Sequence, residues 1–262
     1  MSTLTITIVQ TRLHWEDKAA NLAMLEEKIL GVAGPTELVL LPEMFSTGFS
    51  MNPSRLAEGM DGETVRWMKA VAAKKKVILA GSVIIEEDGA YFNRLIWMLP
   101  NGKSGVYDKR HRFAYAGEDQ EYTAGNKRLI ASVKGWKINL QICYDLRFPV
   151  WARQHQASAG PEYDLLVYVA NWPEKRQHAW KSLLTARAIE NQCYVAGINR
   201  VGEDGNGIVY NGGSTVIDPL GETLYQKDGD EDLFTITLRK EELDEVRERF
   251  PFWRDADNFT IL

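Results

Sequence analysis

The sequence predicts an α/β fold in which two packed sheets are covered by helices on their outer faces. Strand-like and helical segments alternate along the chain, which is typical of layered α/β proteins. Residues 38–41 form a short, wholly apolar run that ends at Pro42, as expected for a strand buried on both faces. Because neither a change in composition nor a linker interrupts the 262 residues, we expect one domain spanning residues 1–262.

Hydrophobic periodicity assigns the elements of the first half. Apolar residues three or four positions apart, such as Leu22, Leu25 and Ile29, predict helices. Short apolar or alternating runs bounded by turn residues predict strands. The expected elements are a strand at 4–9, a helix at 21–32, a strand at 38–41, a helix at 64–73, a strand at 77–84, and two hairpin-like pairs of strands at 91–98 with 103–107 and at 130–133 with 136–143.

The second half repeats this alternation of strands and helices. Turns are expected at residues 205–207 and 218–221, where Gly, Asn, Asp and Pro gather. The expected elements are a helix at 150–156, a strand at 165–170, a helix at 177–192, strands at 194–198, 214–217 and 233–238, and a closing helix at 240–248.

Composition and charge exclude several classes of function. The net charge of −5 gives no reason to expect a nucleic-acid partner. No apolar run reaches the length of a membrane span, and the first residues lack the pattern of a secretion signal, so we expect a cytoplasmic protein. The two cysteines cannot build a disulfide framework. The four histidines are scattered, and no ligand spacing predicts a metal site.

Three expected strands each end in a chemically reactive side chain. Glu43 follows the apolar strand, Lys109 follows the strand at 103–107, and Cys143 ends the strand at 136–143. Each residue has an ordinary interpretation by itself: a helix cap, a surface charge or a small buried side chain. Sites in α/β proteins gather at the carboxyl ends of strands, so the three together indicate one site.

The segments around these residues resemble the three signature segments of the nitrilase superfamily of carbon–nitrogen hydrolases. They read Leu-Pro-Glu-Met-Phe at 41–45, Tyr-Asp-Lys-Arg-His at 107–111 and Cys-Tyr-Asp-Leu-Arg-Phe-Pro at 143–149. Segments 170–173 and 186–192 are also similar to family segments. The resemblance covers the chain from the first strand to about residue 238, and it implies a four-layer α-β-β-α sandwich.

The resemblance also implies a mechanism, which the chemistry of the residues supports. Cys143 is expected to be the nucleophile and Glu43 the general base, because a thiol is mostly protonated at neutral pH and needs a base. Lys109 is expected to stabilise the oxyanion of the tetrahedral intermediate. A second glutamate of the family corresponds to Glu118, counted back from Gly125, with Glu121 as the other candidate. No cofactor is implied.

Residues near the signature segments are candidates for substrate binding. Asp145 and Arg147 either orient the loop of the nucleophile or contact substrate, and Trp172 either lines the pocket or packs in the core. Phe49 and Phe113 are expected to contribute to packing or to contact substrate. Cys193 is expected to be a core residue. The substrate-binding candidates are Tyr144, Arg147, Trp172, Phe45 and Arg112, the last of which replaces a residue that is usually apolar in the family.

Within the superfamily, the chain most resembles the omega-amidases. The segments that carry this likeness are 42–49, 109–111, 168–173 and 250–259. Such enzymes release ammonia from the distal amide of 2-oxoglutaramate or 2-oxosuccinamate. The alternatives are a nitrilase, an N-carbamoyl amino acid hydrolase, a deaminated-glutathione amidase and a protein without catalytic activity on the same fold. The family usually pairs subunits through the helices expected at 150–156 and 177–192, so a homodimer is expected.

Overall fold

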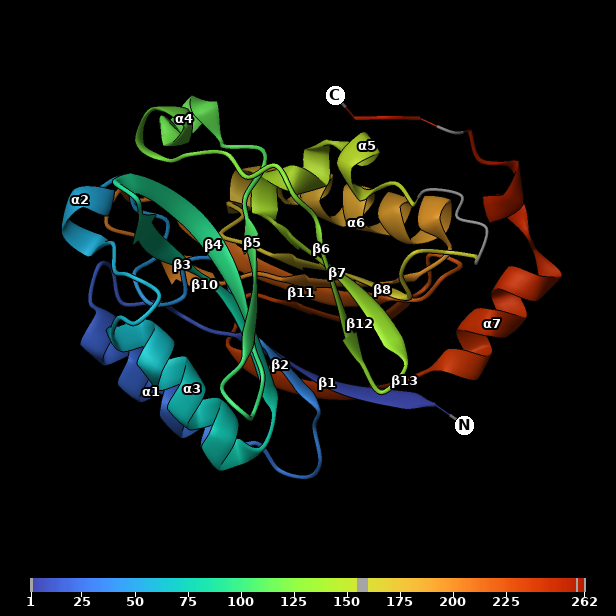
Figure 1. The fold of residues 1–262 in the computed structure, drawn as a ribbon, viewed down its shortest axis with the longest axis horizontal. Coiled ribbons are helices and arrows are strands. Elements are labelled where there is room, and N and C mark those ends of the chain that lie inside the picture. The colour runs from blue at the N-terminus through green and yellow to red at the C-terminus, as the bar shows by residue number, and fades with distance from the viewer. Residues whose placement is uncertain (1, 155–159, 258, 262) are drawn as a thin grey trace.

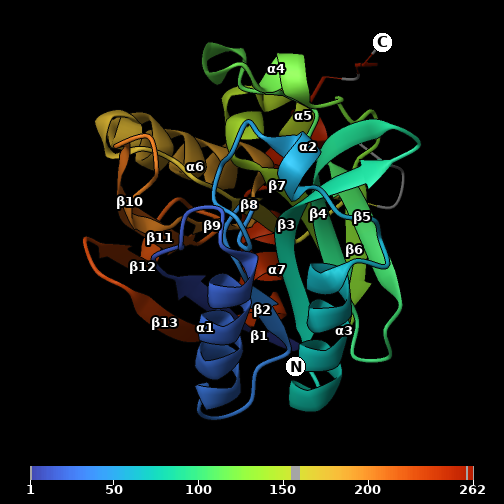
Figure 2. The ribbon, with the colours of Figure 1, turned by 90° about the vertical axis from the view of Figure 1, so that its left-hand side faces the viewer.

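The computed structural model describes residues 2–154, 160–257 and 259–261. Two β-sheets pack face to face, and helices cover the outer face of each sheet, as the sequence predicts. Figure 1 shows α1 and α3 on one side of the paired sheets and α5 and α6 on the other, and Figure 2 shows α1 and α3 lying side by side. The helices are α1 (Lys18–Gly31), α2 (Pro53–Leu56), α3 (Glu63–Lys75), α4 (Glu118–Glu121), α5 (Pro149–Ala152), α6 (Gln177–Asn191) and α7 (Lys240–Arg249).

The first sheet has six strands in the order β13-β1-β2-β3-β4-β5. Strands β1, β2 and β3 run parallel, whereas β4 pairs antiparallel with both β3 and β5. Strand β5 therefore runs in the same direction as β2, and both end at the same edge. The strands are β1 (Thr3–Gln10), β2 (Leu38–Leu40), β3 (Ile78–Glu87), β4 (Ala90–Met98), β5 (Ser104–Asp108) and β13 (Asp232–Arg239).

The second sheet has seven strands, six in the order β10-β11-β9-β8-β7-β6 and β12 paired with β11. Strands β7, β8 and β9 are parallel to one another. The strands are β6 (Leu129–Val133), β7 (Trp136–Ile142), β8 (Leu165–Val169), β9 (Tyr194–Ile198), β10 (Val201–Glu203), β11 (Val209–Ile217) and β12 (Thr223–Asp228).

The short strand β2 shows how the layers are held together. Leu38 and Leu40 lie in the apolar cluster between the two sheets, whereas Val39 lies in the cluster beneath α1 and α3. Alternate side chains of a strand point to opposite faces, so this strand is buried on both sides. That burial explains its continuous apolar sequence and confirms the expected buried strand.

Some expected boundaries differ from those in the structure. The helix expected at 150–156 is the single turn Pro149–Ala152, because the backbone of Arg153 leaves the helical conformation; residues 155–159 lie outside the described part of the chain. Strands β10 and β12 were not expected. The first has only three residues, and the second is mostly exposed and lacks an apolar pattern. In the described part of the chain, no helix is both long enough and apolar enough to cross a membrane.

Candidate active site

The structure brings the three reactive strand ends together. Glu43 lies just beyond β2, Lys109 follows β5, and Cys143 follows β7 in the facing sheet. All three side chains are buried. The backbone N–H of Asn171, just beyond β8, donates to Oε2 of Glu43 over 2.9 Å, and the Cys143 thiol lies 3.9 Å from the Asn171 carbonyl oxygen. Asn171 therefore joins the base candidate of one sheet to the thiol of the other.

Lys109 lies between two buried carboxylates. Its Nζ donates to Oε1 of Glu43 over 2.8 Å and to both carboxylate oxygens of Glu118 over 2.9 and 2.8 Å. Glu118 is fully buried, whereas Glu121 is exposed, so Glu118 is the second glutamate at the site. Burial by itself lowers the pKa of Lys109, but the charges of Glu118 and Glu43 outweigh it and hold this pKa above its usual range. The ammonium group stays charged.

For the pKa of Glu118, burial outweighs the charge of its partner. Burial raises its pKa, and the charge of Lys109 only partly offsets this effect, while Glu43 raises the pKa further. Asn93 on β4 links the two acids, because its Nδ2 donates to Glu43 over 2.8 Å and to Glu118 over 3.2 Å. The backbone N–H of Phe113 also donates to Glu118 over 2.5 Å. These donors fix both carboxylates around the ammonium group.

Cys143 begins a short 3₁₀ turn, Cys143–Arg147, with a backbone φ of 44°. This left-handed conformation is uncommon for a residue with a side chain and is found at functional sites. Burial raises the pKa of the thiol well above its usual range, the charge of Glu43 raises it further, and Lys109 partly offsets both. The resting sulfur is therefore protonated, and it becomes nucleophilic only when a base removes the proton.

A buried carboxylate, Asp145, holds the turn of Cys143 against the segment of Lys109. One oxygen accepts from the Tyr107 hydroxyl over 2.7 Å and from the backbone N–H of Ile142 over 3.0 Å. The other accepts from the backbone N–H of His111 over 3.0 Å and contacts Nδ1 of the same residue at 2.8 Å. Asp145 therefore orients the loop internally, one of the two roles that the sequence left open.

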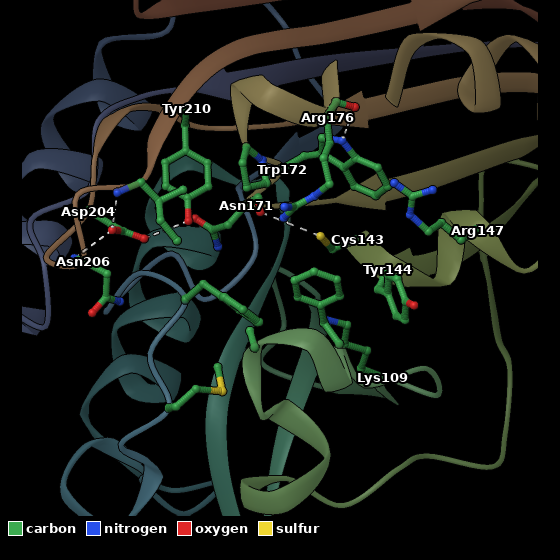
Figure 3. Close-up of a pocket in the computed structure, with 16 residues that line it drawn as sticks. Lys109, Cys143, Tyr144, Arg147, Asn171, Trp172, Arg176, Asp204, Asn206 and Tyr210 are labelled. Atoms are coloured by element: carbon green, nitrogen blue, oxygen red, sulfur yellow. Dashed lines mark hydrogen bonds between the residues drawn. The ribbon is translucent and has the colours of Figure 1, made fainter. Parts of the chain in front are cut away.

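A cavity opens over Cys143, with about 660 Å³ of empty space including its mouth. A concave, mostly apolar wall with a few polar groups is typical of small-molecule sites. Figure 3 shows Cys143, Tyr144 and Arg147 at one end of the cavity and Asp204, Asn206 and Tyr210 at the other. The remaining side chains of the wall are mostly apolar or aromatic, and the lining includes Phe49, Met51, Phe113, Ile208 and Trp172.

Three of the five expected substrate-binding residues, Tyr144, Arg147 and Trp172, line this cavity. Trp172 combines both roles left open for it, since it is only 3% exposed and packs 5.4 Å from the ring of Trp180. Phe49 and Phe113 also line the cavity.

The other two expectations are corrected by the structure. Phe45 is fully buried beneath α3, with its ring 5.8 Å from that of Trp67. It occupies the space next to Gly81, where an added Cβ would lie 2.7 Å from the Phe45 ring. Arg112 donates from its Nη1 to the carbonyl oxygens of Tyr122 over 2.9 Å and Asp119 over 3.2 Å. Its guanidinium group therefore binds the backbone beside α4 instead of lining the cavity.

Sequence reasoning missed several residues of the site. Asn93 lies on a strand that carries no motif. Only its hydrogen bonds to Glu43 and Glu118 in the structure reveal its role. Asn171 belongs to a segment that resembles the family, yet nothing in the sequence indicates that it contacts both Glu43 and Cys143. Arg176 lines the cavity from the turn before α6, 33 residues beyond Cys143, and no local pattern predicts this approach. In the described part of the chain, no cluster of His, Cys, Asp or Glu could hold a metal ion.

Comparison with known proteins identifies the family of the chain. The family model described as carbon-nitrogen hydrolase matches residues 5–248. The omega-amidase YafV of Escherichia coli (strain K12) is 44% identical over 100% of both chains, and the 2-oxoglutaramate amidase of Bacillus subtilis (strain 168) is 32% identical over 96% of both. XC1258 from Xanthomonas campestris is a CN-hydrolase superfamily protein whose crystal structure carries an arsenic adduct in the active site. It is 44% identical over 100% of both chains, with a TM-score of 0.97. The chain belongs to the carbon-nitrogen hydrolase family.

Proposed function

We propose that this protein is an omega-amidase that converts 2-oxoglutaramate or 2-oxosuccinamate into the 2-oxo-dicarboxylate and ammonia through a cysteine thioester. The buried array of Glu43, Lys109 and Glu118 beside the Cys143 thiol is the observation that carries this proposal. Relatives described as omega-amidase and 2-oxoglutaramate amidase, which match at least 90% of this chain, support the choice of substrate.

The first half-reaction forms the acyl-enzyme. Glu43 takes the proton of the Cys143 thiol as sulfur attacks the amide carbon, and the carbonyl oxygen becomes an oxyanion. Lys109 and the backbone N–H of Tyr144 stabilise that charge. The intermediate collapses with cleavage of the carbon–nitrogen bond, Glu43 returns its proton to the leaving nitrogen, and ammonia departs.

The second half-reaction releases the acid. Water attacks the thioester while Glu43 takes its proton, a second oxyanion forms at the same place, and the carbon–sulfur bond breaks with return of the proton to the thiolate. Glu118 does not exchange a proton in this scheme. It holds Lys109 in place through two hydrogen bonds and positions the substrate amide.

A substrate panel tests the proposal. Ammonia release is measured with 2-oxoglutaramate, 2-oxosuccinamate, deaminated glutathione, N-carbamoyl amino acids and nitriles. We expect the highest kcat/KM with a 2-oxo acid amide; a higher value for any other class would contradict the omega-amidase assignment. Cys143→Ala should abolish turnover. Cys193→Ala should keep it, because the charged neighbours of this buried cysteine are Arg247, Asp164 and Glu190 and not the residues of the array.

We also propose that the protein acts as a cytoplasmic homodimer whose subunits each form one domain over residues 1–262. Both cysteines are free and buried, which suits a reducing compartment. Ile189 on α6 and Val150 on α5 are exposed, at 52% and 55%, on the helices that the family uses for pairing. Light scattering that finds only monomers would contradict the dimer.

A further inference from the structure

Two arginine side chains line the cavity, and neither has an acidic partner in the part of the chain that the structure describes. Arg147 and Arg176 both belong to the cavity wall. Among the residues that the structure describes, each guanidinium group contacts an aromatic ring, and no carboxylate lies within ion-pair distance of either. Arginine side chains at a protein surface are commonly paired or fully solvated, whereas a cavity with unpaired cations is suited to an anionic ligand.

Arg176 is the more enclosed of the two. It ends the short turn Glu174–Arg176, whose backbone is anchored where Nε1 of Trp172 donates to the Arg176 carbonyl oxygen over 2.8 Å. Its guanidinium carbon lies 5.0 Å from the centre of the Phe113 ring, and the residue is half-buried. Arg147 is exposed, with its guanidinium carbon 5.1 Å from the centre of the Trp172 ring.

The other charged groups of the cavity are already satisfied. Lys109 is neutralised by Glu43 and Glu118. The carboxylate of Asp204 accepts from the Tyr210 hydroxyl over 2.8 Å and from two backbone N–H groups of its own hairpin. Figure 3 shows Asp204 at the end of the cavity remote from Arg147, with Arg176 between them and above Cys143. Arg147 and Arg176 are therefore the charged groups of the cavity wall that have no carboxylate partner among the described residues.

We propose that Arg176 is a specificity-determining residue that binds the carboxylate of a short amide substrate while Cys143 attacks the amide carbon. The proposal rests on the proposed function and deepens it, because it assigns the recognition of the acid group to one side chain. Arg147 assists from the rim. The substrate class is that of short linear amides whose second end carries a carboxylate within reach of Arg176.

The surroundings of Arg176 explain why it can discriminate. A guanidinium group presents a planar fork of donors that matches a carboxylate, and stacking on Phe113 holds that fork in place before substrate binds, which reduces the entropy lost on binding. A half-buried cation is less screened than one in bulk water. A neutral amide gains none of these interactions, so the charge of Arg176 contributes to selectivity rather than to the bond-breaking step.

The test compares two substrates in matched variants. Arg176→Gln removes one cation of the cavity wall. Lys175→Gln removes the same charge outside the cavity, at the neighbouring exposed lysine of the same turn. We expect Arg176→Gln to lower kcat/KM for 2-oxoglutaramate by about 10- to 100-fold, mainly through KM. Turnover of pentanamide, which has the same chain length and no carboxylate, should stay within about 2-fold, as should both substrates with Lys175→Gln.

A binding measurement makes the result independent of turnover. Calorimetry with glutarate, a dicarboxylate that resembles the product, should give a Kd about 10- to 100-fold weaker in Arg176→Gln than in Lys175→Gln. Arg176→Lys keeps the charge without the planar fork and should fall between the two.

The possible outcomes separate this inference from the proposed function. Equal losses with both amides, or unchanged glutarate binding, would overturn the role of Arg176 while leaving the omega-amidase assignment intact. A wild-type protein that favours pentanamide over 2-oxoglutaramate would instead overturn the proposed function, and this inference with it.

Discussion

Replacement of Asp145 by asparagine should destabilise the protein and slow catalysis, although Asp145 lies behind the cavity wall. Its two oxygens accept from the Tyr107 hydroxyl and from the backbone N–H groups of Ile142 and His111. One of them also contacts Nδ1 of His111. An asparagine keeps one acceptor oxygen and places an NH₂ group on the other side. In either orientation, one backbone N–H, of Ile142 or of His111, then faces a donor.

The expected loss of stability follows from these hydrogen bonds. A buried N–H without an acceptor costs about 1–3 kcal/mol, and the remaining bonds weaken because the acceptor is no longer charged. We expect Asp145→Asn to lower the free energy of unfolding by about 2–4 kcal/mol, which corresponds to a fall in Tm of roughly 5–15 °C for a chain of this size. Because Ile142 precedes Cys143, displacement of the turn should also lower kcat by about 10- to 100-fold.

Calorimetric scans and steady-state ammonia release measure the two effects. Asp119→Asn is the matched control, because it removes the same charge at an exposed site and should change stability by less than about 0.5 kcal/mol. Tyr107→Phe removes one of the four contacts of Asp145 and also the acceptor of Trp151 Nε1, so it should be less stable than the control. An Asp145→Asn variant with the Tm and kcat of the wild type would refute the proposed role of this carboxylate.

Two further predictions concern Glu118 and the two residues that the structure places outside the cavity. Burial raises the pKa of Glu118 above the 4.5 of a free glutamate, so the folded state binds its proton more tightly than the unfolded state, and this group reduces stability as pH rises above 4.5. As pH rises above 4.5, the stability of Glu118→Gln relative to the wild type should therefore increase in denaturant titrations. Its kcat should fall, because Lys109 loses a charged partner. A stability difference that is constant with pH would contradict this cause. Arg112→Ala and Phe45→Ala should leave the KM for 2-oxoglutaramate within about 2-fold of the wild type. Phe45→Ala should also lower the free energy of unfolding by about 3–5 kcal/mol. A large rise in KM with either variant would show that the replaced residue does bind substrate.

Much of the fold could be predicted because local sequence expresses it directly. The apolar run at β2 follows from burial on both faces, and the helical spacing of α1 follows from packing on one face. The edge strand β12 could not be predicted, because its exposed polar residues carry no periodic signal and its assignment depends on hydrogen bonds to β11. Phe45 was misplaced for a similar reason: its proximity to Glu43 in sequence does not determine the direction of its side chain.

The sequence by itself determined the layered α/β architecture and the three reactive strand ends, because hydrophobic period and strand termination are local properties of the chain. It also indicated the amide chemistry, because Glu43, Lys109 and Cys143 occur within motifs. Only the tertiary structure decided how Glu118 and Asn93 enclose Lys109 and how Asp145 holds the turn of Cys143. It also decided that Arg176 lines the cavity with no acidic partner among the described residues. These contacts join residues far apart in sequence, and their energies depend on distance and burial, which the packing of the two sheets creates.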